Sequence, residues 1–456
     1  MRDRETEGDG ADAADRWLYG WALGYAAIGA ASLFVPLYAI DLGAGAFLVS
    51  LIAATAAFAG VPGAILWGRL VTRTRRRRPF LLVALGLAAA VFFSLPFLSS
   101  PWTVLVANAA LWFVVAAATP VLNVIVVEGY PTEQWTERFG LLNHYQGYGW
   151  LAGLVGGGAW SALVGGPRVG LAPLAAKRLF FVVSGVVTLG AVLFVLRQYP
   201  EPQTMSDQRF RRLFHRVRSA NGHTAGAARA APYGPMRLFL AAQGLRFDRE
   251  SVARLRERFS ARLVEYLFAA AVFFAGFSAF FGPLPAYLVE AGYAADAVFA
   301  LFVVNAAASA AAYAPAGSLA AEYDPFSLQA AALAFRTGAF PVVAVAGSAI
   351  APPVGLVVVG LFFFAIGASW AVIAVTATGL VTELAPEPVR AEALGAYTAI
   401  GSLGGGIGSV LGGAVADAAG YLPAFGLAGG CVAVALLLAF DGLRGSSAAF
   451  TGTRRE

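Results

Sequence analysis

Apolar residues fall into long runs along this chain, and short polar breaks separate the runs. Each run has about 18 residues or more, the length that an α-helix needs to cross the ~30 Å apolar core of a bilayer. The pattern predicts twelve membrane-spanning helices, at residues 17–41, 46–68, 79–98, 102–127, 140–165, 179–196, 262–289, 296–320, 326–350, 353–382, 391–416 and 421–441. We therefore expect an all-α integral membrane protein.

The two halves of the chain repeat each other. A shift of 249 positions aligns the first helices of each half, where Pro36, Tyr38, Asp41, Gly43 and Gly68 meet Pro285, Tyr287, Glu290, Gly292 and Gly317. A shift of 255 positions aligns later residues, where Glu128, Pro131, Glu137, Gly140, Gly149, Gly153, Gly157 and Gly158 meet Glu383, Pro386, Glu392, Gly395, Gly404, Gly408, Gly412 and Gly413. One small insertion explains the difference between the two offsets.

This repeat predicts two pseudo-symmetric six-helix bundles, at residues 17–196 and 261–441. A basic linker at 197–260 joins the bundles, and tails at 1–16 and 442–456 flank them. Many secondary transporters are duplicated in this way, with the substrate path between the two halves. Transport is therefore the first functional expectation.

The composition agrees with a membrane protein, since 59% of the 456 residues are hydrophobic and the mean hydropathy is +0.70. The single cysteine, Cys431, excludes an intrachain disulfide. All but one of the 32 basic residues are arginines, and the first residues are acid-rich. That usage is compatible with a salt-loving archaeal source.

The basic residues predict the orientation in the membrane. If the N-terminus is inside, the loops on the outer side carry only Arg168, Lys177 and Arg178. Positively charged loops stay in the cytoplasm, so we expect a multi-pass plasma-membrane protein with both termini cytoplasmic. The linker is expected to rest on the inner membrane surface, with a regulatory segment as the alternative. No basic fold module accompanies these charges, so we do not expect nucleic-acid binding.

The loop after the second predicted helix, residues 63–79, resembles the signature loop of the major facilitator superfamily. The fitting positions, with the neighbouring arginine, are Gly68, Arg69, Leu70, Arg73, Arg76 and Arg77. Thr72 replaces the family's aspartate, and Arg75 replaces its second glycine. The resemblance implies two six-helix bundles and a latch between them on the inner side. Because the aspartate is missing, that latch would be weaker or would use another carboxylate.

Glu383 and Arg390 follow the tenth predicted helix, and Glu128 and Arg138 form a looser version after the fourth. A carboxylate at a helix C-terminus is unfavourable unless a cation lies nearby. The candidate cations are Arg69, Arg73, Arg138 and Arg390. In the superfamily such residues form inner salt bridges, so we expect a gating latch here.

Glycines recur at four-residue spacing on the fifth and eleventh predicted helices: Gly149, Gly153, Gly157 and Gly158, and then Gly404, Gly408, Gly412 and Gly413. The first set resembles the superfamily's antiporter motif, with Leu154 in place of the proline. Glycine at this spacing lets helices approach closely. Close packing and an antiporter hinge both remain open at this stage.

Arg336 is the most unusual residue, because it falls inside a predicted span. A helix starting after it would keep only about fourteen apolar residues, too few to cross a bilayer. If the helix starts near Phe326, Arg336 lies about 15 Å along it. An arginine there normally faces a cavity or a partner. We expect an anionic substrate contact or a counter-charge for a proton-carrying carboxylate, and the alternative is snorkelling along a kink at Pro341.

Other polar residues inside the spans are candidates for the substrate or ion pathway. Asn143, His144 and Gln146 share one helix, where the histidine could relay protons or bond another helix. Asp41 and Glu290 lie at the ends of two helices that the repeat pairs. Each could be a proton site, an outer gate residue or an interface carboxylate. Further cavity candidates are Tyr25, Asn123, Asn305, Tyr313 and Tyr397.

No phosphate-binding loop, metal-ligand spacing or dinucleotide loop is present in the sequence. We therefore expect no enzyme activity, no cofactor and no metal. The leading expectation is a monomer that exports a small organic molecule in exchange for protons, because the helix ending Pro36–Gly43 resembles drug-exporter relatives. Its partners would be the substrate, a coupling ion (proton or sodium) and the lipid bilayer. The alternatives are coupled uptake of a sugar, organic acid or other nutrient, and a membrane sensor that transports nothing.

Overall fold

The computed structural model describes residues 15–60, 62–63, 67, 78–127, 130–131, 134–166, 169, 171–199 and 259–450, without the side chains of residues 136, 388, 391 and 440–450. These residues form helices and connecting turns, with no strand among them. The first half contains α2 (Trp17–Asp41), α3 (Ala46–Phe58), α5 (Arg78–Ser94), the short 3-10 helix η1 (Leu95–Phe97), α6 (Pro101–Val127), α7 (Trp135–Leu163) and α8 (Pro173–Gln198).

The second half contains α12 (Ala261–Phe281), α13 (Leu284–Glu290), α14 (Ala295–Glu322), α15 (Pro325–Ala349), α16 (Val354–Leu384), the 3-10 helix η4 (Glu387–Val389), α17 (Arg390–Ala419) and α18 (Tyr421–Phe450). The expected all-α fold is confirmed. The signature-loop and gate residues Gly68, Arg69, Arg73, Arg76, Arg77 and Glu128 lie outside the described residues.

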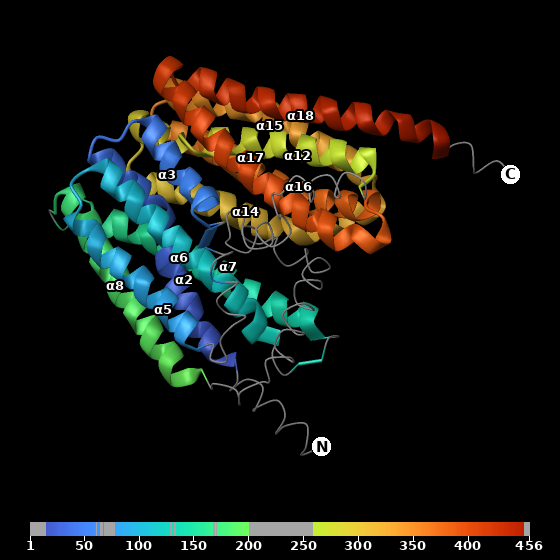
Figure 1. Cartoon of the computed structure of the whole chain (residues 1–456). Helices are drawn as coiled ribbons and strands as arrows, with labels where there is room; N and C mark the ends of the chain where they lie inside the picture. Colours follow the sequence, from blue (N-terminus) through green and yellow to red (C-terminus); the bar gives the residue numbers. More distant parts are fainter. Residues whose placement is uncertain are drawn as a thin grey trace.

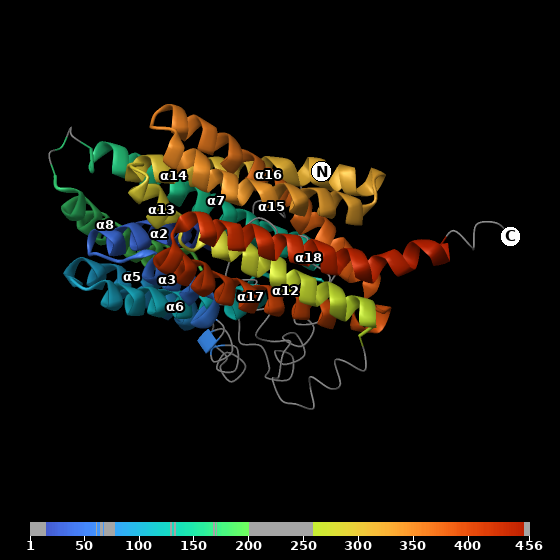
Figure 2. The same cartoon turned by 90° about the horizontal axis from the view of Figure 1, so that it is seen from above.

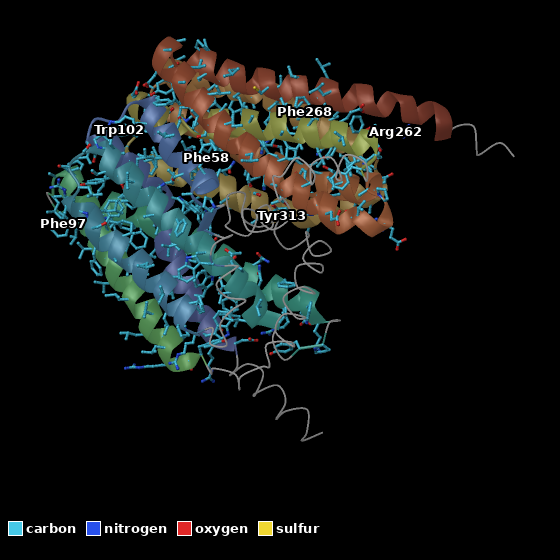
Figure 3. All side chains as sticks on the ribbon, in the orientation of Figure 1. Phe58, Phe97, Trp102, Arg262, Phe268 and Tyr313 are labelled. Carbon is cyan, nitrogen blue, oxygen red and sulfur yellow. The ribbon has the colours of Figure 1, made fainter. Side chains whose placement is uncertain are left out.

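Ten of the described helical segments are long and apolar enough to cross a bilayer. The shorter apolar α3 and the more polar α7 complete the expected set of twelve. Large apolar side chains project from the outside of the bundle, including Phe97, Trp102 and Phe268 (Figure 3). Such an extensive exposed apolar surface is what contact with lipid requires.

Several element boundaries differ from the predicted ones, among them the start of α7 at Trp135, where residue 140 was predicted. Lys177 and Arg178 were expected in a loop, but α8 already begins at Pro173 and includes both. The predicted seventh helix is divided, because α12 ends at Phe281 and α13 begins at Leu284. The last helix continues to Phe450. Apolar runs mark only the lipid-embedded part of a helix, so charged first turns and polar ends escape a hydropathy pattern.

The glycine stripes hold corresponding helices together in the two halves. A Cβ added at Gly149 or Gly153 would overlap the carbonyl oxygen of Ala22 or Ala26 on α2. A Cβ at Gly404 would overlap the carbonyl of Ala271 on α12, and Gly408 and Gly412 make the same approach to Ala275 and Ala279. Ala22 and Ala271 are themselves related by the 249-position shift. The same backbone-to-backbone packing therefore occurs in both halves.

The two halves meet at one end of the molecule and diverge towards the other (Figure 1). We call the end with Asp41, Glu290 and Ala419 the far side, and the end with Trp17, Gln198 and Ala261 the terminal side. The halves touch mainly through two helix pairs, α3 with α17 and α7 with α14, and α13 adds smaller contacts with α2 and α3. Figure 2 shows the same arrangement from above, with α3 next to α17.

Candidate substrate cavity

A cavity of about 260 Å³ lies between the halves. Both halves contribute to its wall, through α2, α3, α6 and α7 on one side and α12 to α17 on the other. Aromatic rings dominate the lining: Trp112, Trp150, Phe274, Phe277, Phe281, Phe302 and Trp370. Mostly apolar walls with a few polar groups are typical of a small-molecule site.

Arg336 lines this cavity from α15 and is only 1% exposed. Its Nε donates a hydrogen bond to Ser369 Oγ at 3.0 Å, and its Nη2 donates to the carbonyl of Ile366 at 2.7 Å. The guanidinium carbon lies 4.3 Å from the centre of the Phe277 ring and 5.8 Å from the centre of the Trp370 ring. These contacts hold the guanidinium among aromatic faces, which attract cations. The side chain is directed to the cavity wall and does not snorkel to the surface.

Most polar side chains of the lining bond to backbone carbonyls. Asn108 donates to the Ile52 carbonyl at 3.1 Å, Asn305 donates to the Phe363 carbonyl at 2.9 Å, and Ser409 donates to the Ser50 carbonyl at 2.7 Å. Similar bonds tie Ser32, Thr398 and Ser402 to their own helices. Ser309 differs, because its hydroxyl is buried with no hydrogen-bond partner in the described part of the chain.

Contacts on the far side close the cavity there. Phe299 of α14 belongs to the hydrophobic core of the first half, where its ring lies 4.8 Å from that of Phe34. Gly158 leaves room for it, since an added Cβ would lie 3.2 Å from the Phe299 Cβ. At the equivalent place in the other pair, a Cβ on Gly413 would overlap the side chain of Ser50 on α3. The two helix pairs are thus sealed by glycines related by the repeat.

Asp417, near the end of α17, extends this seal to the first turn of α3. Its carboxylate accepts a hydrogen bond from the backbone N–H of Phe47 at 3.2 Å. The first turn of α3 contains no acidic residue of its own. A carboxylate at a helix N-terminus is favourable because it faces unsatisfied N–H groups and the positive end of the helix dipole. The second half therefore caps a helix of the first.

Asp41 and Glu290 make contacts within their own halves. Asp41 pairs with Lys177 of α8 at 2.7 Å, and Lys177 also donates to the Leu37 carbonyl at 3.1 Å. Glu290 accepts a hydrogen bond from the hydroxyl of Tyr421 in α18 at 2.5 Å. In each half, a carboxylate at the far-side end of α2 or α13 thus contacts the start of the half's last helix, α8 or α18. Both carboxylates join helices of one half at the far side.

Arg138 of the predicted inner gate forms an ion pair with Asp15 on the terminal side. Its Nε donates to the Val126 carbonyl at 3.0 Å, and its guanidinium lies 4.0 Å from the centre of the Tyr130 ring. Burial lowers the pKa of Arg138, but the hydrogen bond and negative charge of Asp15 outweigh that effect and raise it. Glu383 and Arg390, the other gate candidates, are exposed.

The model of the Major Facilitator Superfamily matches residues 18–378. The chain belongs to the major facilitator superfamily. It is therefore a multi-pass membrane transport protein. A search of curated protein sequences finds no significant match.

Solved superfamily structures share the fold at low sequence identity. The nucleoside transporter NupG has a TM-score of 0.65 at 11% identity, covering 95% of this chain and 98% of that one. A bacterial homolog of the human lysosomal transporter Spinster has a TM-score of 0.65 at 14% identity, covering 94% and 96%. The xylose transporter XylE from E. coli has a TM-score of 0.59 at 15% identity, covering 94% and 98%. At these identities the likeness shows the fold alone.

The predicted pathway residues divide into two groups in this superfamily member. Arg336 and Asn305 line the cavity directly. The others lie outside its lining, although some contact it. The ring centre of Tyr25 lies 6.0 Å from that of the lining residue Trp150, and the ring centre of Tyr397 lies 5.7 Å from that of Phe274. The Tyr313 hydroxyl accepts a hydrogen bond from the indole N–H of Trp370 at 3.1 Å. Figure 3 shows Tyr313 where the halves diverge.

The polar cluster on α7 does not reach the cavity. His144 is exposed, and the centre of its ring lies 4.1 Å from the centre of the Tyr148 ring. Asn143 donates to the Phe139 carbonyl of its own helix at 2.7 Å, and Gln146 is buried away from the lining. Asn123 is also fully buried, within α6. Nothing in this conformation brings these residues together around a ligand.

Sequence reasoning missed several residues that matter here. Ser369 and Ser309 are small hydroxyl residues in apolar helices, where only the rotation of the helix decides whether they face a cavity. Asp417 lies at the end of a predicted span, at a place where loop carboxylates are common. The one available signal for Asp417 was the absence of an acid in the first turn of α3, which left that N-terminus uncapped.

Proposed function

We propose that the protein is a secondary active transporter that exports a small organic molecule across the plasma membrane by alternating access, in exchange for protons. The observation that carries this proposal is a cavity walled by both halves, which touch on the far side and diverge on the terminal side. Rocking of two such halves about a central site exposes the site to each side in turn. The glycine-lined contacts are suited to this motion because they hold few interlocking side chains.

The orientation follows from charge. The predicted topology assigns nearly all the arginines to loops and tails on the side of the N-terminus. Since positively charged loops stay inside, we propose that the terminal side is cytoplasmic. The conformation described here then faces inward. Binding from the cytoplasm is the step that an exporter requires in this state. The helix ending Pro36–Gly43 and the glycine pattern of α7 also favour export, because both resemble features of exporter relatives.

Coupled uptake is the second candidate. The transporters NupG and XylE, named for nucleosides and xylose, share this fold, and fold does not fix direction. Sodium is the alternative coupling ion. Among the described residues that line the cavity there is no aspartate, glutamate or histidine. In our proposal the coupling proton therefore binds outside the cavity, on a carboxylate whose contacts change between the two conformations.

The test is transport in liposomes of known orientation with a trapped pH-sensitive dye and an imposed proton gradient. Organic cations, sugars, nucleosides and carboxylates are added one at a time. Proton movement that depends on one compound and runs opposite to it supports coupled export. Movement in the same direction replaces export with uptake. If no compound moves with either a proton or a sodium gradient, the proposal of coupled transport is wrong.

A further inference from the structure

Arg336 is the one charged side chain among the described residues that line the cavity. The surrounding wall is aromatic and aliphatic, so the effective dielectric constant is low and the field of the guanidinium is weakly screened. A cationic ligand would be repelled in this space, and an anionic ligand would be attracted.

The geometry around Arg336 fixes its orientation. Hydrogen bonds to Ser369 and to the Ile366 carbonyl attach the guanidinium to α16, and Phe277 covers it at 4.3 Å. A guanidinium held in this way is pre-organised, so little side-chain entropy is lost when it binds a carboxylate. Charge-assisted hydrogen bonds of this kind are about twice as strong as neutral ones.

The other polar groups offer few free donors to a polyhydroxylated ligand. The amide nitrogens of Asn108 and Asn305 and the hydroxyl of Ser409 already donate to backbone carbonyls. Many hydroxyl oxygens of a sugar in this cavity would therefore find no donor, which costs binding free energy. The Ser309 hydroxyl is the exception, because it is buried at the lining with no partner in the described residues. It offers one further hydrogen bond to a ligand.

The volume limits the size of the ligand. An engineered protein cavity of ~150 Å³ holds benzene, and this cavity has about 260 Å³. One aromatic ring with a short side arm fits such a space. Phe274, Phe277 and Trp370 on one wall and Trp112 and Trp150 on the other provide faces for a ring to pack against.

We infer that the ligand of this cavity is a small monocarboxylate with a single aromatic or branched apolar body, bound by Arg336 through its carboxylate and contacted by Ser309. This inference rests on the proposed transport function, because it assigns the ligand of the same cavity.

The test uses three probes of nearly equal shape: phenylacetate, the neutral phenylacetamide and the cation 2-phenylethylammonium. Binding to the purified full-length protein in lipid nanodiscs is measured by calorimetry and by quenching of tryptophan fluorescence, since three tryptophans line the cavity. We expect phenylacetate to bind at least tenfold more tightly than either of the other probes. This comparison needs no variant, so it does not depend on how substitutions affect folding.

Variants then test whether Arg336 provides the charge that selects the anion. Arg336→Gln should weaken phenylacetate binding at least tenfold and remove the preference for the anion, and Ser309→Ala should weaken it two- to fivefold. The matched controls are Arg262→Gln and Ser318→Ala, which remove a like group from exposed positions (Figure 3 labels Arg262). Both should leave binding unchanged. Equal affinity for the three probes, no binding of phenylacetate at millimolar concentration, or full affinity in Arg336→Gln would each overturn the inference.

Failure of the inference and failure of the proposed function are distinguishable. Anion-selective binding without any flux in liposomes supports the inference and refutes transport. Flux of a sugar, nucleoside or cation by a protein that does not bind phenylacetate supports transport and refutes the inference.

Discussion

The carboxylate of Asp417 accepts a hydrogen bond from the backbone N–H of Phe47 at 3.2 Å, although the two residues belong to different halves of the protein. At the position of Phe47 in the second half, the 249-position shift places Asp296, which lies in the first turn of its own helix α14. Helix α14 therefore has a negative charge in its own first turn, whereas the N-terminus of its counterpart α3 is contacted by a carboxylate of the other half. That contact has to break when the far side opens.

Asp417→Asn should shift the protein towards the state that is open on the far side. A carboxylate at a helix N-terminus contributes ~0.3–1 kcal/mol, so the population ratio should change about two- to fivefold. Electron–electron distance measurements between spin labels on Arg197→Cys and Arg262→Cys, in a Cys431→Ser background, report the separation of the terminal ends. We expect more of the short-distance population. Asp296→Asn, which removes an exposed carboxylate on the same side, is the control. If both variants gave the wild-type distribution, Asp417 would not be part of the far-side seal.

The glycine stripes should tolerate no side chain where backbones touch. Gly153→Ala and Gly408→Ala place a methyl group against the carbonyls of Ala26 and Ala275. Overpacking of this kind costs about 1–3 kcal/mol, so thermal unfolding in detergent should occur several degrees lower. Gly156→Ala is the matched control on α7, because nothing lies within 4 Å of an added Cβ there. A midpoint for Gly153→Ala equal to that of the control would contradict the packing described here.

The Asp41–Lys177 pair should stabilise the first half. Its side chains are 25% and 10% exposed, between a surface pair and a buried one, and we expect a coupling of about 1 kcal/mol. A double-mutant cycle with Asp41→Asn and Lys177→Gln, followed by thermal unfolding, measures that coupling. Arg197→Gln, an exposed substitution on the same helix, should have no effect. Additive single changes would mean that the pair contributes nothing.

Ser369→Ala should disturb the orientation of Arg336 without removing its charge. The guanidinium loses the acceptor of its Nε–H, and a lost hydrogen bond to a charged group costs about 1.5–3 kcal/mol. We expect KM for a transported anion to rise more than kcat falls. Ser348→Ala, a serine that bonds to its own helix on α15, should leave KM unchanged. An unchanged KM in Ser369→Ala would show that the hydrogen bond does not position Arg336 for the ligand.

The fold was predictable because it depends on hydropathy and on the repeat. The repeat pairs Gly149 with Gly404 and Ala22 with Ala271, and the structure brings each glycine onto its alanine. The position of Arg336 inside a span was predictable from length alone. Its partners were not, because Ser369 lies on α16, an almost wholly apolar helix whose rotation no periodicity determines.

The charged residues near the membrane surfaces show the same limit. Lys177 looked like a loop residue because it interrupts an apolar run, yet it is a buried helix residue paired with Asp41. Arg138 was expected to pair with a glutamate of the repeat, and it binds Asp15 at the end of the predicted tail. Local sequence indicates that a charge needs a partner, but the partner depends on how distant helices pack.

The most direct test of alternating access is the accessibility of one cavity residue from each side of the membrane. Ser402→Cys, in a Cys431→Ser background, places a thiol on the cavity wall. A membrane-impermeant maleimide is added to right-side-out and to inside-out vesicles. We predict modification from both sides, faster from the terminal side, without any increase in ion conductance, and slower from the terminal side after Asp417→Asn. Modification from only one side under every condition would contradict alternating access.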